Sequence, residues 1–104
     1  MSYQYVMGVD HGTGGCKVTC LRSDGTIFSE AYVPYPSLYP YPQWVEQDPE
    51  TWIQAAFEAI SLATAELGAD EKKNITAISF CAPHHVAVLM DQGRNVIRPA
   101  IMWN

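Results

Sequence analysis

A carboxylate placed directly before a glycine-rich turn has the clearest chemical potential in this sequence. Asp10 ends an apolar run, and Gly12, Thr13 and Gly14 follow before Lys17 opens a second run. Because glycine accepts positive φ, successive amides of such a turn can converge on phosphate oxygens, and the Thr13 hydroxyl adds a donor. Asp10 would repel a bare phosphate, but it would help to hold Mg²⁺ between itself and the phosphate. A plain hairpin with a solvated aspartate is the alternative, and these residues alone leave both interpretations open.

Two other glycine loops are excluded by their context. A P-loop needs four residues between its glycines and then Gly-Lys-Ser/Thr, and that pattern is absent. A dinucleotide-binding loop needs a third glycine at the start of a helix, but Lys17 occupies that position. The element after the turn is instead predicted to be a strand.

Length and composition predict one packed domain. The chain has 104 residues, of which 48% are apolar and 16% charged. Its 6 basic and 11 acidic residues give a net charge of −5, and the basic residues are scattered, so we expect no nucleic-acid partner. We find no secretion signal and no apolar run near the roughly 18 residues of a membrane span, so we expect no membrane partner and a cytoplasmic location.

Three cysteines are predicted to be reduced. If Cys16 and Cys20 lie on one strand, a rise of about 3.3 Å per residue separates them by roughly 13 Å. One disulfide or one metal ion could not join them, so we expect both to be core residues. The spacing of Cys81 from these two cysteines matches no metal-binding or disulfide pattern.

The turn is predicted to lie within a three-stranded antiparallel meander, followed by a helix. Strands are expected at residues 5–10, 16–22 and 27–33, with a hairpin turn at Asp24-Gly25. Residues 34–44 are rich in proline and tyrosine and are expected to form an ordered surface connection. Asp48, Pro49 and Glu50 predict a helix start. The helix should end near Leu67, before Gly68. Two apolar stripes are expected to face the sheet together: Ile53, Phe57, Ile60 and Leu67, and Trp52, Ala56, Ala59 and Ala63.

The last third of the chain is predicted to return to the sheet. After a polar connection at residues 69–74, the apolar run at 75–81 is expected to form a strand buried on both faces. Further strands are expected at 86–90 and from 96 to 103, with a turn at 91–93. The prediction is an α/β fold with a mixed sheet, in which a helix crosses over to the strand at 75.

Four stretches together resemble the FGGY carbohydrate kinases, and most closely their xylulokinase-like members. They are "GVDHGTGGCK" from Gly8, "WVEQDPETW" from Trp44, "AISFCAPHHVAVLMD" from Ala77 and "RPAIMWN" from Arg98. They stand in the family's order and spacing and span nearly the whole chain. Gly14 replaces a hydroxyl residue that is usual in the first motif. Ala82 and Pro83 replace a common Gly-Gln in the third, so the sugar need not be xylulose.

The resemblance implies a ribonuclease H-like, actin-like ATPase fold and transfer of the ATP γ-phosphoryl group to a hydroxyl of a small sugar, with a xylulose-like ketose favoured. ATP and Mg²⁺ are the implied cofactors. It places Asp10 beside Mg²⁺, through water, and the transferring phosphate. It also implies phosphate contacts by Gly12, Thr13 and Gly14 and sugar contacts by His84, His85, Trp103 and Asn104. On extended backbone His84 and His85 would point to opposite sides, and His85 matches the family's histidine. His11 receives no role.

Length is the main departure from the family. Its chains are several times longer, and its catalytic base and adenosine site lie beyond this segment. We therefore expect residues 1–104 to be a partial N-terminal FGGY kinase domain that is inactive alone and self-associates as a homo-oligomer through exposed apolar surface. The alternative is a non-catalytic half-domain of the same ancestry that binds phosphate, a nucleotide or a protein.

Overall fold

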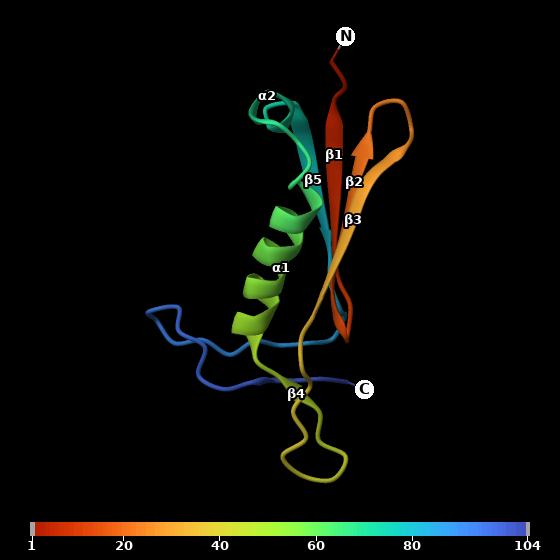
Figure 1. The fold of residues 1–104 in the computed structure, drawn as a ribbon. Helices are drawn as coiled ribbons and strands as arrows, with labels where there is room; N and C mark the ends of the chain where they lie inside the picture. The colour runs from red at the N-terminus through yellow and green to blue at the C-terminus, as the bar shows by residue number, and fades with distance from the viewer. Residues whose placement is uncertain (1, 104) are drawn as a thin grey trace.

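A four-stranded mixed sheet with one helix across one face forms the body of the molecule (Figure 1). The computed structural model describes residues 2–103. The strand order is β3-β2-β1-β5, with β5 parallel to β1 and the other pairs antiparallel. Its elements are β1 (Tyr5–His11), β2 (Gly15–Arg22), β3 (Ile27–Pro34), α1 (Pro49–Ala63) and β5 (Ile75–Cys81). A small second sheet pairs β4 (Glu46–Gln47) with β6 (Ala100–Ile101), and α2 (Ala69–Lys72) is a single turn.

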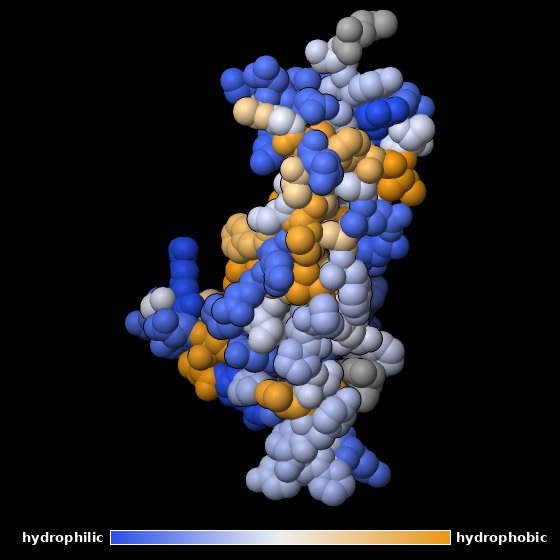
Figure 2. Space-filling view, viewed as in Figure 1, coloured by the Kyte–Doolittle hydropathy of each residue, from blue (hydrophilic) through white to orange (hydrophobic). Residues whose placement is uncertain are grey.

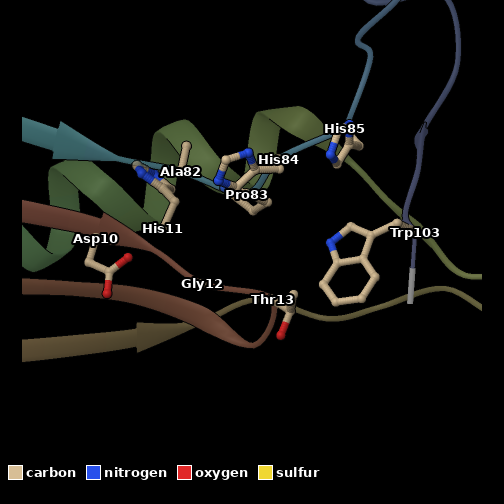
Figure 3. A pocket seen from close by; sticks show the side chains of 9 residues that line it. All are labelled: Asp10, His11, Gly12, Thr13, Ala82, Pro83, His84, His85 and Trp103. Atoms are coloured by element: carbon tan, nitrogen blue, oxygen red, sulfur yellow. The ribbon is translucent and has the colours of Figure 1, made fainter.

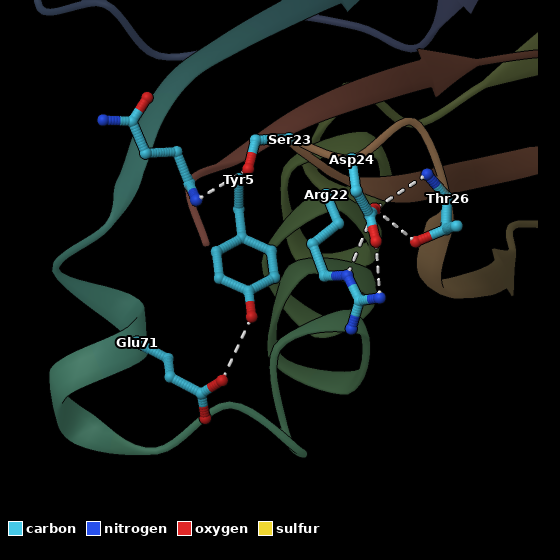
Figure 4. A network of polar contacts seen from close by, with 7 residues as sticks. Tyr5, Arg22, Ser23, Asp24, Thr26 and Glu71 are labelled. Carbon is cyan, nitrogen blue, oxygen red and sulfur yellow. Dashed lines mark hydrogen bonds and ion pairs between the residues drawn. The ribbon is translucent and has the colours of Figure 1, made fainter. Parts of the chain in front are cut away.

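The predicted meander and its hairpin turn are confirmed. Gly25 has a φ of 91°, which glycine accepts without steric cost. Asp24 accepts hydrogen bonds from the Thr26 amide at 3.1 Å and from Arg22 Nη2 at 2.7 Å, and these donors hold its pKa well below the usual range. At the same end of the sheet, the Tyr5 hydroxyl donates to Glu71 of α2 at 3.0 Å (Figure 4).

The core lies between α1 and the meander. α1 packs mainly on β2 and β3, and the side chains of Cys16, Val18 and Cys20 are fully buried beneath it. The prediction of unpaired core cysteines is therefore confirmed, and burial raises the pKa of both Cys16 and Cys20. Small side chains let the helix approach closely, and Ala59 is also fully buried.

The start of α1 is as predicted, but its end and one of its stripes are not. Asp48 accepts a hydrogen bond from the Glu50 amide at 3.0 Å. The helix ends at Ala63 rather than Leu67, although Leu67 remains buried. Ile53 and Phe57 are 53% and 69% exposed, whereas Ile60 of the same stripe is partly buried against the core.

The last third of the chain differs most from the prediction. β5 has the predicted bounds, but it is an edge strand and its Phe80 is 63% exposed, so the prediction of burial on both faces is wrong. α1 packs over β2 and β3 and leaves β5 uncovered. Residues 86–90 form no strand, apart from an isolated bridge between Met90 and Val96, and the predicted final strand is reduced to β6.

Hydrophobic side chains remain at the surface. Figure 2 shows them over α1 and over the segments beside its lower end. The exposed ones include Ile53, Phe57, Leu62, Ile78, Phe80, Leu89, Ile97 and Ile101. Within residues 2–103, no helix has the length and apolar character needed to cross a membrane.

Candidate functional site

The predicted site residues meet at one edge of the sheet. β1 and β5 are parallel neighbours, and their register pairs Asp10 with Cys81, so both strands end at this edge. A cavity of about 510 Å³ opens there. It is lined by Asp10, His11, Gly12, Thr13, Ala82, Pro83, His84, His85 and Trp103 (Figure 3). Gly14 lies in the adjoining turn but does not line the cavity, and Asn104 lies outside the described residues.

Tyr35 holds two carbonyls of the glycine turn by hydrogen bonds. Its hydroxyl donates to the Gly12 carbonyl, and its amide donates to the Gly14 carbonyl at 3.2 Å. The Tyr35 side chain is buried, and burial raises the pKa of its phenol to about 12. The phenol therefore keeps its proton and remains a donor throughout the physiological pH range.

Gln47 of β4 holds the carbonyl between them. Its Nε2 donates to the Thr13 carbonyl at 2.6 Å. The turn closes on itself through the Gly12 amide, which donates to the Gly15 carbonyl at 2.9 Å. All four carbonyls from Gly12 to Gly15 thus have protein donors.

Two amides of the same turn, those of Thr13 and Gly14, are left free. Within residues 2–103, neither the Thr13 nor the Gly14 amide donates to a backbone or side-chain acceptor, and both residues are exposed. A turn whose carbonyls are hydrogen-bonded and whose amides are free presents partial positive charge, which suits an anion such as phosphate. The predicted phosphate site requires positive charge of this kind.

The cause of this polarity differs from the one predicted. Among the described glycines, only Gly25 has a positive φ, so the turn from Gly12 to Gly15 does not depend on left-handed backbone. Gly15 is instead required for close packing. A Cβ there would lie 2.6 Å from the Tyr32 ring and 2.7 Å from the Val33 carbonyl oxygen.

Asp10 is exposed at the mouth of the turn. It is opposite Lys17 in the β1–β2 ladder, but Lys17 Nζ pairs with Glu30 at 2.8 Å. Among the described residues Asp10 forms no ion pair, and no group of three or more His, Cys, Asp or Glu side chains is placed to hold a metal. One free carboxylate beside two free amides still fits Mg²⁺ with a phosphate, because Mg²⁺ usually takes one or two protein carboxylates, substrate phosphates and several waters.

His84 and His85 both line the cavity, contrary to the prediction that they point to opposite sides. Their ring centroids are 5.7 Å apart and the rings are tilted by 34°. His85 has a φ of 56°, so the backbone is not extended there and the alternation of a strand does not apply. Two imidazoles therefore face one space.

The other two rings at the cavity have different surroundings. His11 Nε2 lies 3.1 Å from the Trp52 carbonyl oxygen, which can only accept, so Nε2 carries the proton. This hydrogen bond ties β1 to α1, and the His11 ring also stacks on Tyr35. Trp103 is 67% exposed and offers a broad apolar face from the end of the β6 segment.

The sequence analysis assigned no role to the side chains of β4. Glu46 is buried and forms an ion pair with Arg98, and the backbone of β4 pairs with that of β6 two residues before Trp103. Gln47 supports the glycine turn from the same short strand. The sequence does show Glu46 and Gln47 directly before a capped helix. It does not indicate their roles, because their partners Arg98 and Thr13 lie far away in the sequence.

Comparisons with known proteins agree with this geometry. Residues 5–104 match the N-terminal domain of the FGGY family of carbohydrate kinases. The xylulose kinase of Bacillus subtilis is 35% identical over 101 residues, which are 97% of this chain and 20% of that protein. A glycerol kinase of Leptospira biflexa is 34% identical over 102 residues, which are 95% of this chain and 20% of that protein. The crystal structure of a xyloylose kinase from Brucella ovis superposes with a TM-score of 0.88 at 34% identity, covering 97% of this chain and 21% of that one.

The chain belongs to the FGGY family of carbohydrate kinases, and its fold is that of the actin-like ATPases. It spans about a fifth of the length of the curated relatives it matches first.

Proposed function

We propose that this chain is the N-terminal segment of an ATP-dependent sugar kinase, which transfers the γ-phosphoryl group of ATP to a hydroxyl of a xylulose-like ketose. One observation carries the proposal. Two free amides, at Thr13 and Gly14, follow Asp10 in the glycine turn beside a cavity that is also lined by three imidazoles and an indole.

Each residue has a role in this proposal. The Thr13 and Gly14 amides bind phosphate oxygens, the Thr13 hydroxyl adds a donor, and Gly12 closes the phosphate-binding turn through its hydrogen bond to the Gly15 carbonyl. Asp10 orients Mg²⁺ through a water ligand, and the ion, when bound, offsets the charge of the transferring phosphoryl group.

The sugar lies on the other wall of the cavity. His85 and His84 contact its hydroxyl groups, and Trp103 continues that wall. Asn104, the next residue in the sequence, is proposed as a further sugar ligand. The named relatives include both xylulose and glycerol kinases, so the ketose as substrate is a separate step of the proposal beyond the kinase activity.

We propose that the proton of the sugar hydroxyl is removed by a group outside this segment, as the family resemblance implies. Asp10 is committed to the metal, and a general base must lie within hydrogen-bond reach of the sugar hydroxyl. We therefore propose that residues 1–104 are a partial domain without activity alone. The exposed apolar side chains favour self-association, so we propose a homo-oligomer. We also propose a cytoplasmic location without a nucleic-acid or membrane partner, because the basic residues are scattered.

The test is ADP release with a panel of ketoses, aldoses and glycerol. The full-length kinase that carries this segment should turn over at least one ketose, and residues 1–104 should turn over none. Mg·ADP binding by the full-length protein without turnover of any sugar would favour the non-catalytic half-domain instead. Turnover by residues 1–104 would refute the partial-domain proposal.

A further inference from the structure

Gln47 is a buried amide that joins three segments around the glycine turn. Its side chain is 1% exposed. Nε2 donates to the Thr13 carbonyl at 2.6 Å and to Ser37 Oγ at 3.0 Å, while Oε1 accepts from Trp52 Nε1 at 2.8 Å. All its hydrogen-bonding groups are therefore used within the protein.

Chemistry fixes the orientation of this amide. The indole N–H of Trp52 can only donate, so it must face the oxygen of Gln47. The carbonyl of Thr13 can only accept, so it must face the nitrogen. A flipped amide would oppose donor to donor on one side and acceptor to acceptor on the other.

The anchored carbonyl determines the direction of a neighbouring amide. The Thr13 carbonyl and the Gly14 N–H belong to one peptide plane and point in opposite directions across it. Holding the carbonyl against Gln47 therefore turns the Gly14 N–H away from the scaffold. Since glycine accepts either peptide orientation, Gly14 itself opposes a flip only weakly.

We propose that Gln47 is a positioning residue, which keeps the Thr13–Gly14 peptide oriented with its N–H toward the phosphate of the nucleotide. The proposal rests on the proposed function, because it assumes that a phosphate occupies the turn. Without Gln47, the peptide is free to present a carbonyl oxygen to the phosphate, which repels it.

The test uses the full-length kinase with two substitutions of similar shape. Gln47→Met removes every hydrogen bond of the amide, and Gln47→Glu keeps an acceptor for Trp52 but faces the Thr13 carbonyl with a second acceptor. Ser37→Ala is the matched control, because it removes the other partner of Nε2 and leaves the bond to Thr13.

Two readouts separate positioning from general support of the fold. Both Gln47 variants should raise the KM for Mg·ATP about ten-fold or more, with the KM for sugar within two-fold of wild type. They should also lose most of the rise in melting temperature that Mg·ADP produces, while the rise produced by sugar is kept. Ser37→Ala should resemble wild type in both readouts.

The outcomes distinguish this inference from the function on which it rests. Wild-type protein that neither binds Mg·ADP nor turns over sugar would overturn both. Wild-type protein that binds Mg·ADP, with Gln47 variants that bind it equally well or lose both ligand responses in parallel, would overturn the positioning role alone.

Discussion

The strands on the two sides of β1 differ in how well they are buried. On one side, β2 and β3 lie under α1, and Val18 is fully buried. On the other side, β5 has an apolar sequence but no helix over it, and Phe80 is 63% exposed. We call these the covered half and the open half.

The candidate site divides along the same line. The glycine turn joins β1 to β2 and is anchored by Tyr35 and Gln47, so the phosphate side belongs to the covered half. His84 and His85 follow β5 and belong to the open half. The difference teaches that the proposed phosphate side is preorganised by hydrogen bonds within residues 2–103, whereas the proposed sugar side follows a strand that α1 does not cover. Four experiments test this division, from the largest expected effect to the smallest.

Asp10→Asn should have the largest effect. In the full-length kinase, we expect kcat/KM to fall about 100- to 1000-fold, because a neutral amide holds Mg²⁺ and its water poorly. Steady-state ADP release measures this effect. Asp24→Asn, at the far end of the sheet, is the control and should leave kcat unchanged. A rate within two-fold of wild type for Asp10→Asn would place phosphoryl transfer outside the covered half.

Gly15→Ala should destabilise the covered half by about 3 kcal/mol, because an added Cβ would overlap the Tyr32 ring and the backbone of β3. Urea unfolding of residues 1–104 measures the change. Gly8→Ala is the control, since nothing lies within 4 Å of a Cβ there and its effect should be below about 0.5 kcal/mol. Equal losses of unfolding free energy in Gly15→Ala and Gly8→Ala would show that β3 does not pack closely against Gly15.

A matched pair of truncations compares the halves directly. Val18→Ala should cost about 2 kcal/mol of unfolding free energy, because it removes two buried methyl groups and leaves a cavity. Phe80→Ala removes more atoms but should cost less than about 0.5 kcal/mol, because the ring is mostly exposed. A larger cost at Phe80 than at Val18 would reverse the comparison.

Tyr35→Phe should cost about 1 kcal/mol of unfolding free energy, less than Val18→Ala, through loss of the hydrogen bond to Gly12. Its effect depends on pH. Burial raises the folded-state pKa of Tyr35 to about 12 from 10.0, so the folded protein holds the phenol proton more tightly than the unfolded chain. This stability is fully present below pH 10 and is lost as the pH rises toward 12.

The pH dependence is measured as a difference between proteins. Unfolding free energies of wild type and Tyr35→Phe should converge between pH 10 and 12. Parallel curves over that range would mean that Tyr35 is not a buried donor. The other tyrosines are common to both proteins and cancel in the difference.

Features set by local sequence were predictable. The Asp24-Gly25 turn, the Asp48 cap and the alternation that buries Cys16 and Cys20 depend on neighbouring residues, and the structure agrees with each. The set of site residues came from the family resemblance, and six of them line the cavity together.

Features set by long-range contacts were not predictable. The donors to the turn come from Tyr35 and Gln47, which are 23 and 34 residues from their acceptors. The positive φ of His85 follows no local pattern, and because of it the side chains of His84 and His85 do not alternate as they would on a strand. The exposure of β5 depends on which strands α1 covers, which an apolar run cannot reveal.

The carbonyls of the glycine turn are all hydrogen-bonded within the protein, and we propose that its free Thr13 and Gly14 amides bind phosphate. The most direct measurement is a crystal structure of the full-length kinase with Mg²⁺ and a non-hydrolysable ATP analogue. We predict phosphate oxygens at about 2.7–3.2 Å from the Thr13 and Gly14 nitrogens, with the Thr13 carbonyl still bonded to Gln47. A bound nucleotide whose phosphates lie out of hydrogen-bond reach of both amides would contradict the account.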